Sequence, residues 1–328
     1  MARSASVLKV SFSWKGNSMV YIIFLISLLA VSKGADWLVD GAVGITKSLG
    51  ISPVIVGATV VSLGTTLPEA LISSFAAYQG RSEVIAGTAL GSILFNTAVI
   101  LGLSVLIKPA IISSRDTLYK AGTMIAVPTL FALLSLDHHI SRWDALLLVF
   151  ILLLFLISNM MKGVKQSQGN NNKETGQKLS QHFIRLAAGC ASVVLGARFL
   201  LDSGVEIARF LGVSEAVIAL TLFAVGSSLP ELITGITAAK RGHIDLVLGN
   251  IMGANTLNII FVMSLSGLIQ PFAVDPNVLQ ADIPLSLVTM GILFVPALFT
   301  RRIDRWQGLI TILGYILCLI FIIGIRSY

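Results

Sequence analysis

The nonapeptide SLGTTLPEA, residues 62–70, places a glutamate directly after a proline inside a long apolar run. Proline removes a backbone donor and crowds the preceding helical turn, and Gly64 adds local freedom, so we expect the helix to open here. In lipid, the released carbonyls need other partners or a polar cavity. Taken alone, such a stretch is most often a simple proline kink beside one acid, so its meaning depends on the rest of the chain.

The composition is that of a polytopic membrane protein. The 328 residues are 55% hydrophobic and 12% charged, with a mean hydropathy of +0.89, whereas soluble proteins carry about 25% charged residues. Cys190 and Cys318 lie in apolar runs and predict no disulfide framework. The four histidines lie near the ends of apolar runs, which argues against a buried histidine metal site or base. The net charge of +7 fits basic membrane loops, and no basic stripe with aromatics predicts nucleic-acid binding.

Apolar segments long enough to span a bilayer predict an all-α fold of about ten transmembrane helices. The segments are 19–45, 51–79, 84–107, 119–136, 142–161, 183–210, 213–239, 244–269, 279–299 and 306–325. A polar, basic stretch at 161–185 has the composition of a disordered linker. The predicted organisation is therefore a tail at 1–18, five helices at 19–160, the linker at 161–185, and five helices at 186–328.

Basic residues predict the orientation in the cytoplasmic membrane. When loops are numbered alternately, one side collects most of them and should be cytoplasmic, with the linker. These are Lys47, Lys108, Arg115, Lys120, Lys162, Lys165, Lys173, Lys178, Arg185, Lys240, Arg241, Arg301, Arg302 and Arg305. Both termini then face outward. Three basic residues of the tail oppose this orientation, a conflict that would disappear if Met19 were the true start.

The opening stretch occurs twice. LGTTLPEA at 63–70 matches VGSSLPEL at 225–232, and GTALGSILFN at 87–96 matches GNIMGANTLN at 249–258. The offsets agree, since 231 − 69 = 162 and 258 − 96 = 162. Each copy holds five predicted spans, and because five is odd the second copy enters the membrane with opposite polarity. This is an inverted repeat, which in secondary transporters places the substrate site near the bilayer midplane on interrupted helices.

Polar side chains of the repeats share helix faces. Ser62, Thr65, Thr66 and Glu69 are spaced as one face, and the second copy presents Ala224, Ser227, Ser228 and Glu231. Asn96 and Asn258 end two further faces that include Ser92 and Ala254. The polar groups of these faces are oxygen donors, which suit Ca²⁺ or Na⁺ rather than zinc or copper. Gly87, Gly91, Gly249 and Gly253 are expected to allow close helix packing.

These motifs resemble the two alpha-repeats of the Na⁺/Ca²⁺ exchanger branch of the cation/Ca²⁺ antiporter superfamily. KGADWLVDGA at 33–42 is also similar to the first span of prokaryotic members. The resemblance implies ten helices, alternating access and a central site with four cation positions, whose first helix pair slides across the bundle. By matching position it implies carboxylates from Glu69 and Glu231, amide oxygens from Asn96 and Asn258, backbone carbonyls from Ser62, Thr65, Ala224 and Ser227, and other oxygens from Thr66, Ser92 and Ser228.

The chain departs from the family pattern in ways that bear on coupling. Ala254 stands where the first repeat has Ser92, so one hydroxyl is missing. Asn258 replaces the acid associated with K⁺-dependent members, and the second acid usual in the proton-coupled branch is absent. Na⁺ coupling is favoured, although two glutamates could also exchange two protons for one Ca²⁺.

The sequence therefore predicts a monomeric antiporter that exchanges Ca²⁺ for Na⁺ across the cytoplasmic (inner) membrane, without a cofactor. A Ca²⁺/H⁺ antiporter on the same scaffold is the nearest alternative, and a cation channel is a further one. No HExxH or Gly-x-Gly-Asp motif lies in a span, so an intramembrane enzyme is not expected.

Overall fold

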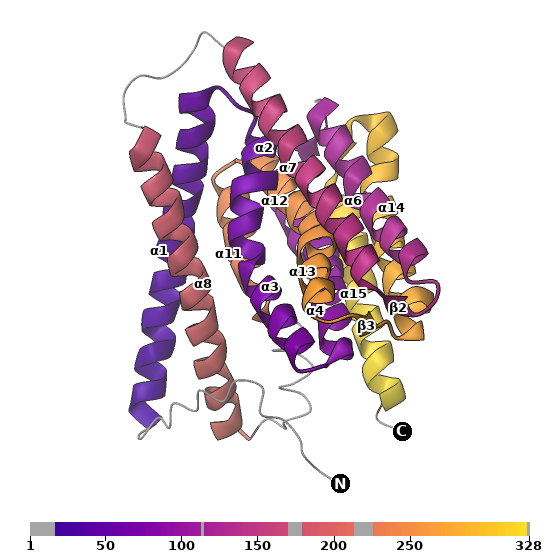
Figure 1. Ribbon diagram of the computed structural model, residues 1–328. Helices are drawn as coiled ribbons and strands as arrows, with labels where there is room; N and C mark the ends of the chain where they lie inside the picture. Colours follow the sequence, from indigo (N-terminus) through magenta and orange to yellow (C-terminus); the bar gives the residue numbers. More distant parts are fainter. Residues whose placement is uncertain (1–16, 113–114, 170–178, 213–225, 327–328) are drawn as a thin grey trace.

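The computed structural model describes residues 17–112, 115–169, 179–212 and 226–326, and these residues form a mostly helical bundle (Figure 1). Several spans are composites of α-helix and wider π-helical turns (η). The first half comprises α1 (Asn17–Leu49), α2 (Pro53–Val56), η1 (Gly57–Val61), α3 (Ser62–Tyr78), α4 (Ser82–Phe95), η2 (Asn96–Leu101), α5 (Gly102–Ile107), α6 (Arg115–Leu134) and α7 (Arg142–Gly169). The second half comprises α8 (Leu179–Phe210), α11 (Leu229–Lys240), α12 (Ile244–Leu257), η4 (Asn258–Met263), α13 (Ser264–Ile269), η5 (Val278–Asp282), α14 (Ile283–Thr300) and α15 (Arg305–Arg326).

Eight of the described helical segments are long and apolar enough to cross a membrane. The prediction of a polytopic all-α protein is confirmed at that level. Of the predicted segment 213–239, residues 213–225 lie outside the described residues, and the rest includes α11. Helix also extends into both ends of the polar stretch 161–185, since α7 continues to Gly169 and α8 begins at Leu179.

The first predicted interruption differs from expectation. α3 runs through Gly64 and Pro68, and the irregular backbone lies just upstream, in the wide turns of η1. Pro68 still cannot donate to the Gly64 carbonyl, so one helical hydrogen bond is lost inside α3. In the second copy the chain does turn, at Ser227 and Ser228, before α11 begins.

Element bounds recur at the offset found in the sequence. α4, η2 and α5 are matched by α12, η4 and α13, and the two-residue strand β1 (Ala110–Ile111) by β3 (Phe272–Ala273), each pair 162 residues apart (for example 258 − 96). Left-handed glycines recur as well, at Gly50 and Gly212 and at Gly80 and Gly242. β1 pairs antiparallel with β4 (Arg302–Ile303), and β2 (His139–Ile140) with β3, so each half is joined to the other.

Helices α1 and α8 lie side by side at one edge of the molecule, as Figure 1 shows. The pair is antiparallel, because Phe24 lies near Gly204, the Ala30 carbonyl accepts from Ser192 Oγ at 2.8 Å, and Gly41 meets Leu186. Glycines set the spacing: a Cβ on Gly41 would lie 2.5 Å from the Leu186 nitrogen, and one on Gly189 would lie 2.4 Å from the Leu38 nitrogen. Close backbone approach of this kind is how helices associate in lipid.

The α12–η4–α13 span forms the centre of the bundle, and every residue of α12 except Asp245 is buried. Glycines again allow the contact, since a Cβ on Gly249 would lie 2.4 Å from the Val54 carbonyl oxygen and one on Gly253 would lie 2.5 Å from the Ala58 Cα. The packing predicted for these two glycines is confirmed. The same role for Gly87 and Gly91 stays a prediction, because the matching partner positions 216 and 220 lie outside the described residues.

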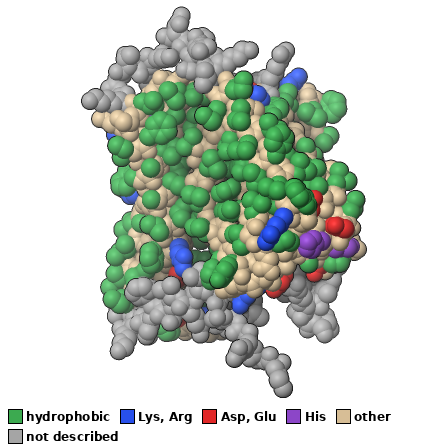
Figure 2. Space-filling view, in the orientation of Figure 1, with side chains coloured by type: hydrophobic (Ala, Val, Ile, Leu, Met, Phe, Trp, Pro, Cys, Tyr) green, Lys and Arg blue, Asp and Glu red, His purple; other side chains and the backbone are tan. Residues whose placement is uncertain are grey.

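The outer surface is apolar over much of its extent. Figure 2 shows apolar side chains across one face with few charged ones among them. Large exposed side chains include Leu29 (65%), Leu71 (70%) and Phe299 (84%). Single exposed apolar residues are ordinary on soluble proteins, but a surface with this many large ones is typical of a surface that contacts lipid.

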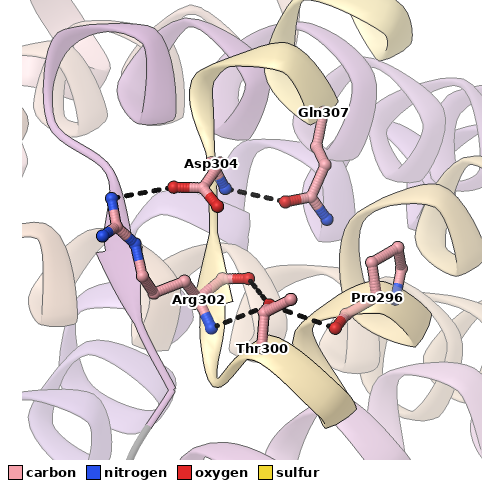
Figure 3. Close-up of polar contacts among 5 residues, drawn as sticks. All are labelled: Pro296, Thr300, Arg302, Asp304 and Gln307. Atoms are coloured by element: carbon pink, nitrogen blue, oxygen red, sulfur yellow. Dashed lines mark hydrogen bonds and ion pairs between the residues drawn. The ribbon is translucent and has the colours of Figure 1, made fainter.

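The turn between α14 and α15 shows how polar groups are satisfied at a span end (Figure 3). Arg302 pairs with Asp304 at 2.8 Å, and the Gln307 side chain accepts from the Asp304 backbone N–H at 2.7 Å. The Thr300 hydroxyl donates to the Pro296 carbonyl at 3.1 Å, inside α14. These contacts fix the turn at Arg301, which adopts the left-handed conformation.

Candidate cation site

Each copy of the motif supplies one buried carboxylate. Glu69 of α3 is 0% exposed and Glu231 of α11 is 1% exposed. The carboxylates are near enough to repel one another electrostatically. Ser92 of α4 lies between the copies, since its Oγ donates to Glu69 Oε1 at 3.4 Å and lies 3.3 Å from Ser227 Oγ. The Thr65 side chain lies near Glu231, and its hydroxyl donates to the Ser62 carbonyl at 3.4 Å. The structure thus brings the LPE motif of the first repeat, with Glu69, close to that of the second, with Glu231.

Around these carboxylates, several buried oxygens have no hydrogen-bond partner among the described residues. They include three pairs at matching positions of the two repeats, namely Glu69 Oε2 and Glu231 Oε2, Asn96 Oδ1 and Asn258 Oδ1, and Thr66 Oγ1 and Ser228 Oγ. Asn250 Oδ1 and Ser73 Oγ belong to the same set of buried oxygens. A buried polar group without a partner costs about 1–3 kcal/mol, so native proteins tolerate few of them without a reason. Six such oxygens at matching positions of the two repeats indicate a ligand that binds to oxygen atoms.

The predicted polar face of α3 is confirmed. Ser62, Thr65, Thr66, Glu69 and Ser73 are all 0% exposed, whereas Leu67 and Leu71 on the opposite face are 48% and 70% exposed. Helical spacing alone separates these two faces. The interior face therefore carries five oxygen-bearing side chains together with buried alanines such as Ala70, and the outer face carries lipid-compatible leucines.

The other predicted site residues are buried or partly buried, except for Ala224, which lies outside the described residues. Ala254 of α12 is 0% exposed, and Asn258, the first residue of η4, is 1% exposed. Ser92 of α4 is 2% exposed, and Asn96, the first residue of η2, is 0% exposed. Ser228 is fully buried and Ser227 partly buried in the turn before α11. The Ala224 carbonyl stays a prediction.

Asn255 was not identified from the sequence. It is 0% exposed, its Oδ1 accepts from Asn96 Nδ2 at 3.2 Å, and its Nδ2 donates to Thr97 Oγ1 at 2.7 Å. The residue lies off the face defined by Asn250, Ala254 and Asn258, and the first repeat has Ile93 at the matching position. The signal available in the sequence was an asparagine within GANTLN (residues 253–258), inside an apolar segment where a polar amide needs a hydrogen-bond partner.

Lys120 was assigned to a loop by the sequence, and that placement was wrong. It lies inside α6, 1% exposed, where its ammonium donates to Asn159 Oδ1 of α7 and stands 5.6 Å from the centre of the Phe155 ring. The charge is accommodated because the amide oxygen and the ring face both attract a cation. This pair lies apart from the carboxylates and joins two helices.

An ion-pair cluster joins α1 to the turn that follows α11. Arg241 pairs with Asp40 and, at 3.8 Å, with Asp36, and it donates to the Asp36 carbonyl at 3.2 Å. Lys108 Nζ donates to the neighbouring Gly242 carbonyl at 2.7 Å. Asp202, which corresponds to Asp40 in the second repeat, pairs instead with Arg198 of its own helix at 4.0 Å.

A small cavity has Asn250, one of the buried unpartnered groups among the described residues, in its lining. Its walls come from α1, α11 and α12, with Val61 of η1. It is lined by Leu38, Val39, Val61, Thr234, Gly235, Ala238, Leu246, Val247 and Asn250. Apolar side chains of α1, Leu38 and Val39, thus line the same cavity as Asn250.

A family comparison identifies this arrangement. The family described as sodium/calcium exchanger protein matches the chain twice, over residues 19–161 and 182–324. The chain belongs to this family. The two matches correspond to the two halves of the chain, so each repeat resembles the family unit by itself.

Individual relatives agree with the family assignment. The inner membrane protein YrbG of Escherichia coli is 32% identical over 295 residues, covering 87% of this chain and 90% of YrbG. The sodium/calcium exchanger MaX1 of Methanosarcina acetivorans is 28% identical, covering 92% and 97% of the two chains. A solved structure of the sodium-calcium exchanger NCX_Mj superposes with a TM-score of 0.79 at 28% identity, covering 92% of this chain and 98% of that one.

Proposed function

We propose that the protein is a secondary active antiporter that exchanges Ca²⁺ for Na⁺ by alternating access. The observation that carries the proposal is a set of six buried oxygens that have no hydrogen-bond partner in the described part of the chain and that match in pairs between the two repeats. Its relatives MaX1 and NCX_Mj are both named sodium/calcium exchangers. The family is one of ion exchangers rather than enzymes.

The charges of the site explain why ions would compete for it. Glu69 and Glu231 place two negative charges in an apolar interior, at considerable cost when nothing balances them. One Ca²⁺ balances both, and so do monovalent cations bound nearby. Because neither ion can be fully accommodated while the other is present, release of one accompanies binding of the other, which is the requirement for an exchanger.

The residue roles follow from position. Glu69 and Glu231 would hold both ions; Asn96, Asn258, Thr66, Ser92 and Ser228 would supply further side-chain oxygens; and Ser62, Thr65, Ala224 and Ser227 would contribute backbone carbonyls. All of these are hard oxygen ligands of the kind that Ca²⁺ and Na⁺ take. Pro68, which leaves the Gly64 carbonyl without a helical donor, supports the use of backbone oxygens.

The transport cycle would use ten transmembrane helices arranged as two inverted five-helix halves, at 19–160 and 186–328. The common offset of 162 and the antiparallel contact of α1 with α8 support this architecture. α1 and α8 would slide together across the remaining helices, opening the site to one side at a time. No second chain is needed for such a cycle, so a monomer suffices.

The protein would reside in the cytoplasmic membrane, since its relative YrbG is named an inner membrane protein. Arg241, Lys108 and the polar stretch 161–185 would face the cytoplasm, with both termini outside. In that orientation the ion-pair cluster closes the cytoplasmic approach, so the structure would represent an outward-facing state.

Flux measurements test the function. In proteoliposomes that contain the purified protein, an outwardly directed Na⁺ gradient should drive Ca²⁺ uptake, and a pH gradient of equal size should not. Uptake that follows pH and ignores Na⁺ would favour the Ca²⁺/H⁺ alternative, and Ca²⁺ conduction without a counter-ion would indicate a channel.

Two variants test the site. Glu69→Gln and Glu231→Gln should each abolish exchange while the protein still inserts and purifies as a single species, because each removes one of two buried charges. Glu83→Gln is the matched control, since Glu83 is exposed in the first turn of α4. Normal Ca²⁺ transport by both site variants would refute the assignment.

A further inference from the structure

Asn255 connects the two innermost helices beside the candidate cation site. It is fully buried on α12, and its amide lies between Asn96 and Thr97 of η2, the segment that continues α4. Nothing in the repeat requires it, because Ile93 holds the matching position of the first half. Its contacts, however, determine how Asn96 is oriented.

The contacts form a chain of three hydrogen bonds that ends on the backbone. The Thr97 hydroxyl donates to the Ile93 carbonyl at 2.7 Å. Asn255 Nδ2 donates to Thr97 Oγ1 at 2.7 Å, and also lies 3.5 Å from the Ile93 carbonyl. Asn96 Nδ2 then donates to Asn255 Oδ1 at 3.2 Å.

This chain has only one possible direction. A backbone carbonyl can only accept, so it takes the single proton of the Thr97 hydroxyl. Thr97 Oγ1 must then accept from the next group, which obliges Asn255 to present its NH₂ there and its oxygen to Asn96. Asn96 must in turn present its NH₂ to Asn255 and direct its oxygen away from it.

The oxygen of Asn96 is one of the six that define the site, buried and without a partner among the described residues. If the amide were reversed, its NH₂ would point toward the bound cation and repel it. The orientation therefore matters more for this side chain than for an ordinary buried asparagine.

We infer that Asn255 is a positioning residue that holds the amide oxygen of Asn96 toward the transported cation, acting with Thr97 and the Ile93 carbonyl. The inference rests on the proposed function. Since position 93 is isoleucine, the first half offers Asn258 no amide at the position that matches Asn255, and the two amides of the site are not equivalent in this respect.

Calorimetric titration of Ca²⁺ into the purified full-length protein tests this, with Na⁺ titrated in parallel. Asn255→Leu, which keeps the size but removes both hydrogen bonds, should weaken Ca²⁺ binding about tenfold, the equivalent of one well-oriented hydrogen bond. Thr97→Val breaks the chain at a residue that the site does not use, and should act in the same direction. Thr97→Ser keeps the hydroxyl and should restore binding to that of the unaltered protein.

A double-mutant cycle separates positioning from a structural role. Asn255→Leu should have no further effect on Ca²⁺ affinity once Asn96 is replaced by alanine, because the whole effect passes through Asn96. An additive loss would overturn the inference, as would equal affinities for Thr97→Val and Thr97→Ser. If Asn255→Leu does not fold, the two Thr97 variants decide the question.

Failure of the inference is distinct from failure of the proposed function. Unchanged Ca²⁺ affinity in Asn255→Leu and Thr97→Val, with normal binding by the unaltered protein, overturns the positioning role alone. Absence of Ca²⁺ binding by the unaltered protein overturns the proposed function and the positioning role with it.

Discussion

Replacing Arg241 with glutamine should release α1 from the turn after α11. Arg241 is the cation that binds Asp36 and Asp40 of α1 together with the Asp36 carbonyl. If α1 slides during transport, these contacts break on every cycle. They therefore stabilise the state in which α1 covers the cavity over Asn250, and their loss should favour the state in which it does not.

The size of the effect follows from the exposure of the partners. The Arg241 side chain is 37% exposed, and those of Asp40 and Asp36 are 41% and 44% exposed. Exposed ion pairs of this kind contribute 0.2–1 kcal/mol each, so the cluster is worth about 1 kcal/mol. That free energy corresponds to a change of about fivefold in the ratio of the two states. At about 1 M salt, where the Debye length falls to about 3 Å, the difference should shrink.

Cysteine labelling measures this ratio. Val39 is 0% exposed and lines the cavity beneath α1, so a cysteine placed there should react with a water-soluble maleimide only when α1 has moved. In a background with Cys190 and Cys318 replaced by serine, Arg241→Gln should raise the labelling rate of Val39→Cys about fivefold.

Asp202→Asn serves as the control for this experiment. It is the equivalent acid of the second repeat, and its partner Arg198 belongs to the same helix. It should leave the labelling rate of Val39→Cys unchanged. Equal labelling rates with and without Arg241, at low salt, would refute the idea that the cluster stabilises one access state.

Three further outcomes are expected. Gln79→Arg, at the position that matches Arg241, should place a cation near Asp202 and shift Val39→Cys labelling toward the rate of Arg241→Gln or beyond, because it would stabilise the opposite state. Gly253→Ala should lower the free energy of unfolding by about 1–3 kcal/mol, because its Cβ would lie 2.5 Å from Ala58 Cα, and this loss should appear as a lower thermal midpoint in detergent. Gly204→Ala is the control and should leave the midpoint unchanged, because its Cβ would lie 3.8 Å from Phe24. Burial and the nearby Arg241, Lys108 and Lys47 lower the pKa of His243, so the folded protein binds a proton at this imidazole less readily than the unfolded chain does. The free energy of unfolding should therefore fall as pH decreases below about 6.5. His243→Gln should reduce that fall.

The sequence predicts what depends on local spacing and on duplication. Helical periodicity places Ser62, Thr65, Thr66 and Glu69 on one face, and burial of all four confirms it. Duplication supplies the second set of residues, and the structure brings Glu69 and Glu231 near one another. Neither step requires knowledge of how distant helices pack, which is why both succeed.

Features that depend on tertiary packing were missed. Asn255 lies about 100° around the helix from Ala254, so helical spacing from Asn250 and Ala254 excluded it, although a neighbouring helix supplies its partners. Lys120 is buried because Asn159 and Phe155 of α7 receive its ammonium, and composition could only assign it to a basic loop. The irregular backbone lies at η1 rather than at Gly64–Pro68, because an internal proline removes one hydrogen bond without ending a helix.

The differences between the repeats are as informative as their similarities. Residues proposed to hold cations mostly repeat, as do Glu69 with Glu231 and Asn96 with Asn258, and a site near the symmetry axis requires that. Ser92 and Ala254 are the exception. Residues proposed to act on the site indirectly do not repeat: Asn255 corresponds to Ile93, and Arg241 to Gln79. A fully symmetric chain would give its two access states equal free energies and its two amides equal environments. Sequence differences away from the ion ligands make the two states and the two amides unequal without altering the ligands themselves. We therefore expect the double variant Gln79→Arg, Arg241→Gln to reverse the preferred access state while leaving cation selectivity unchanged.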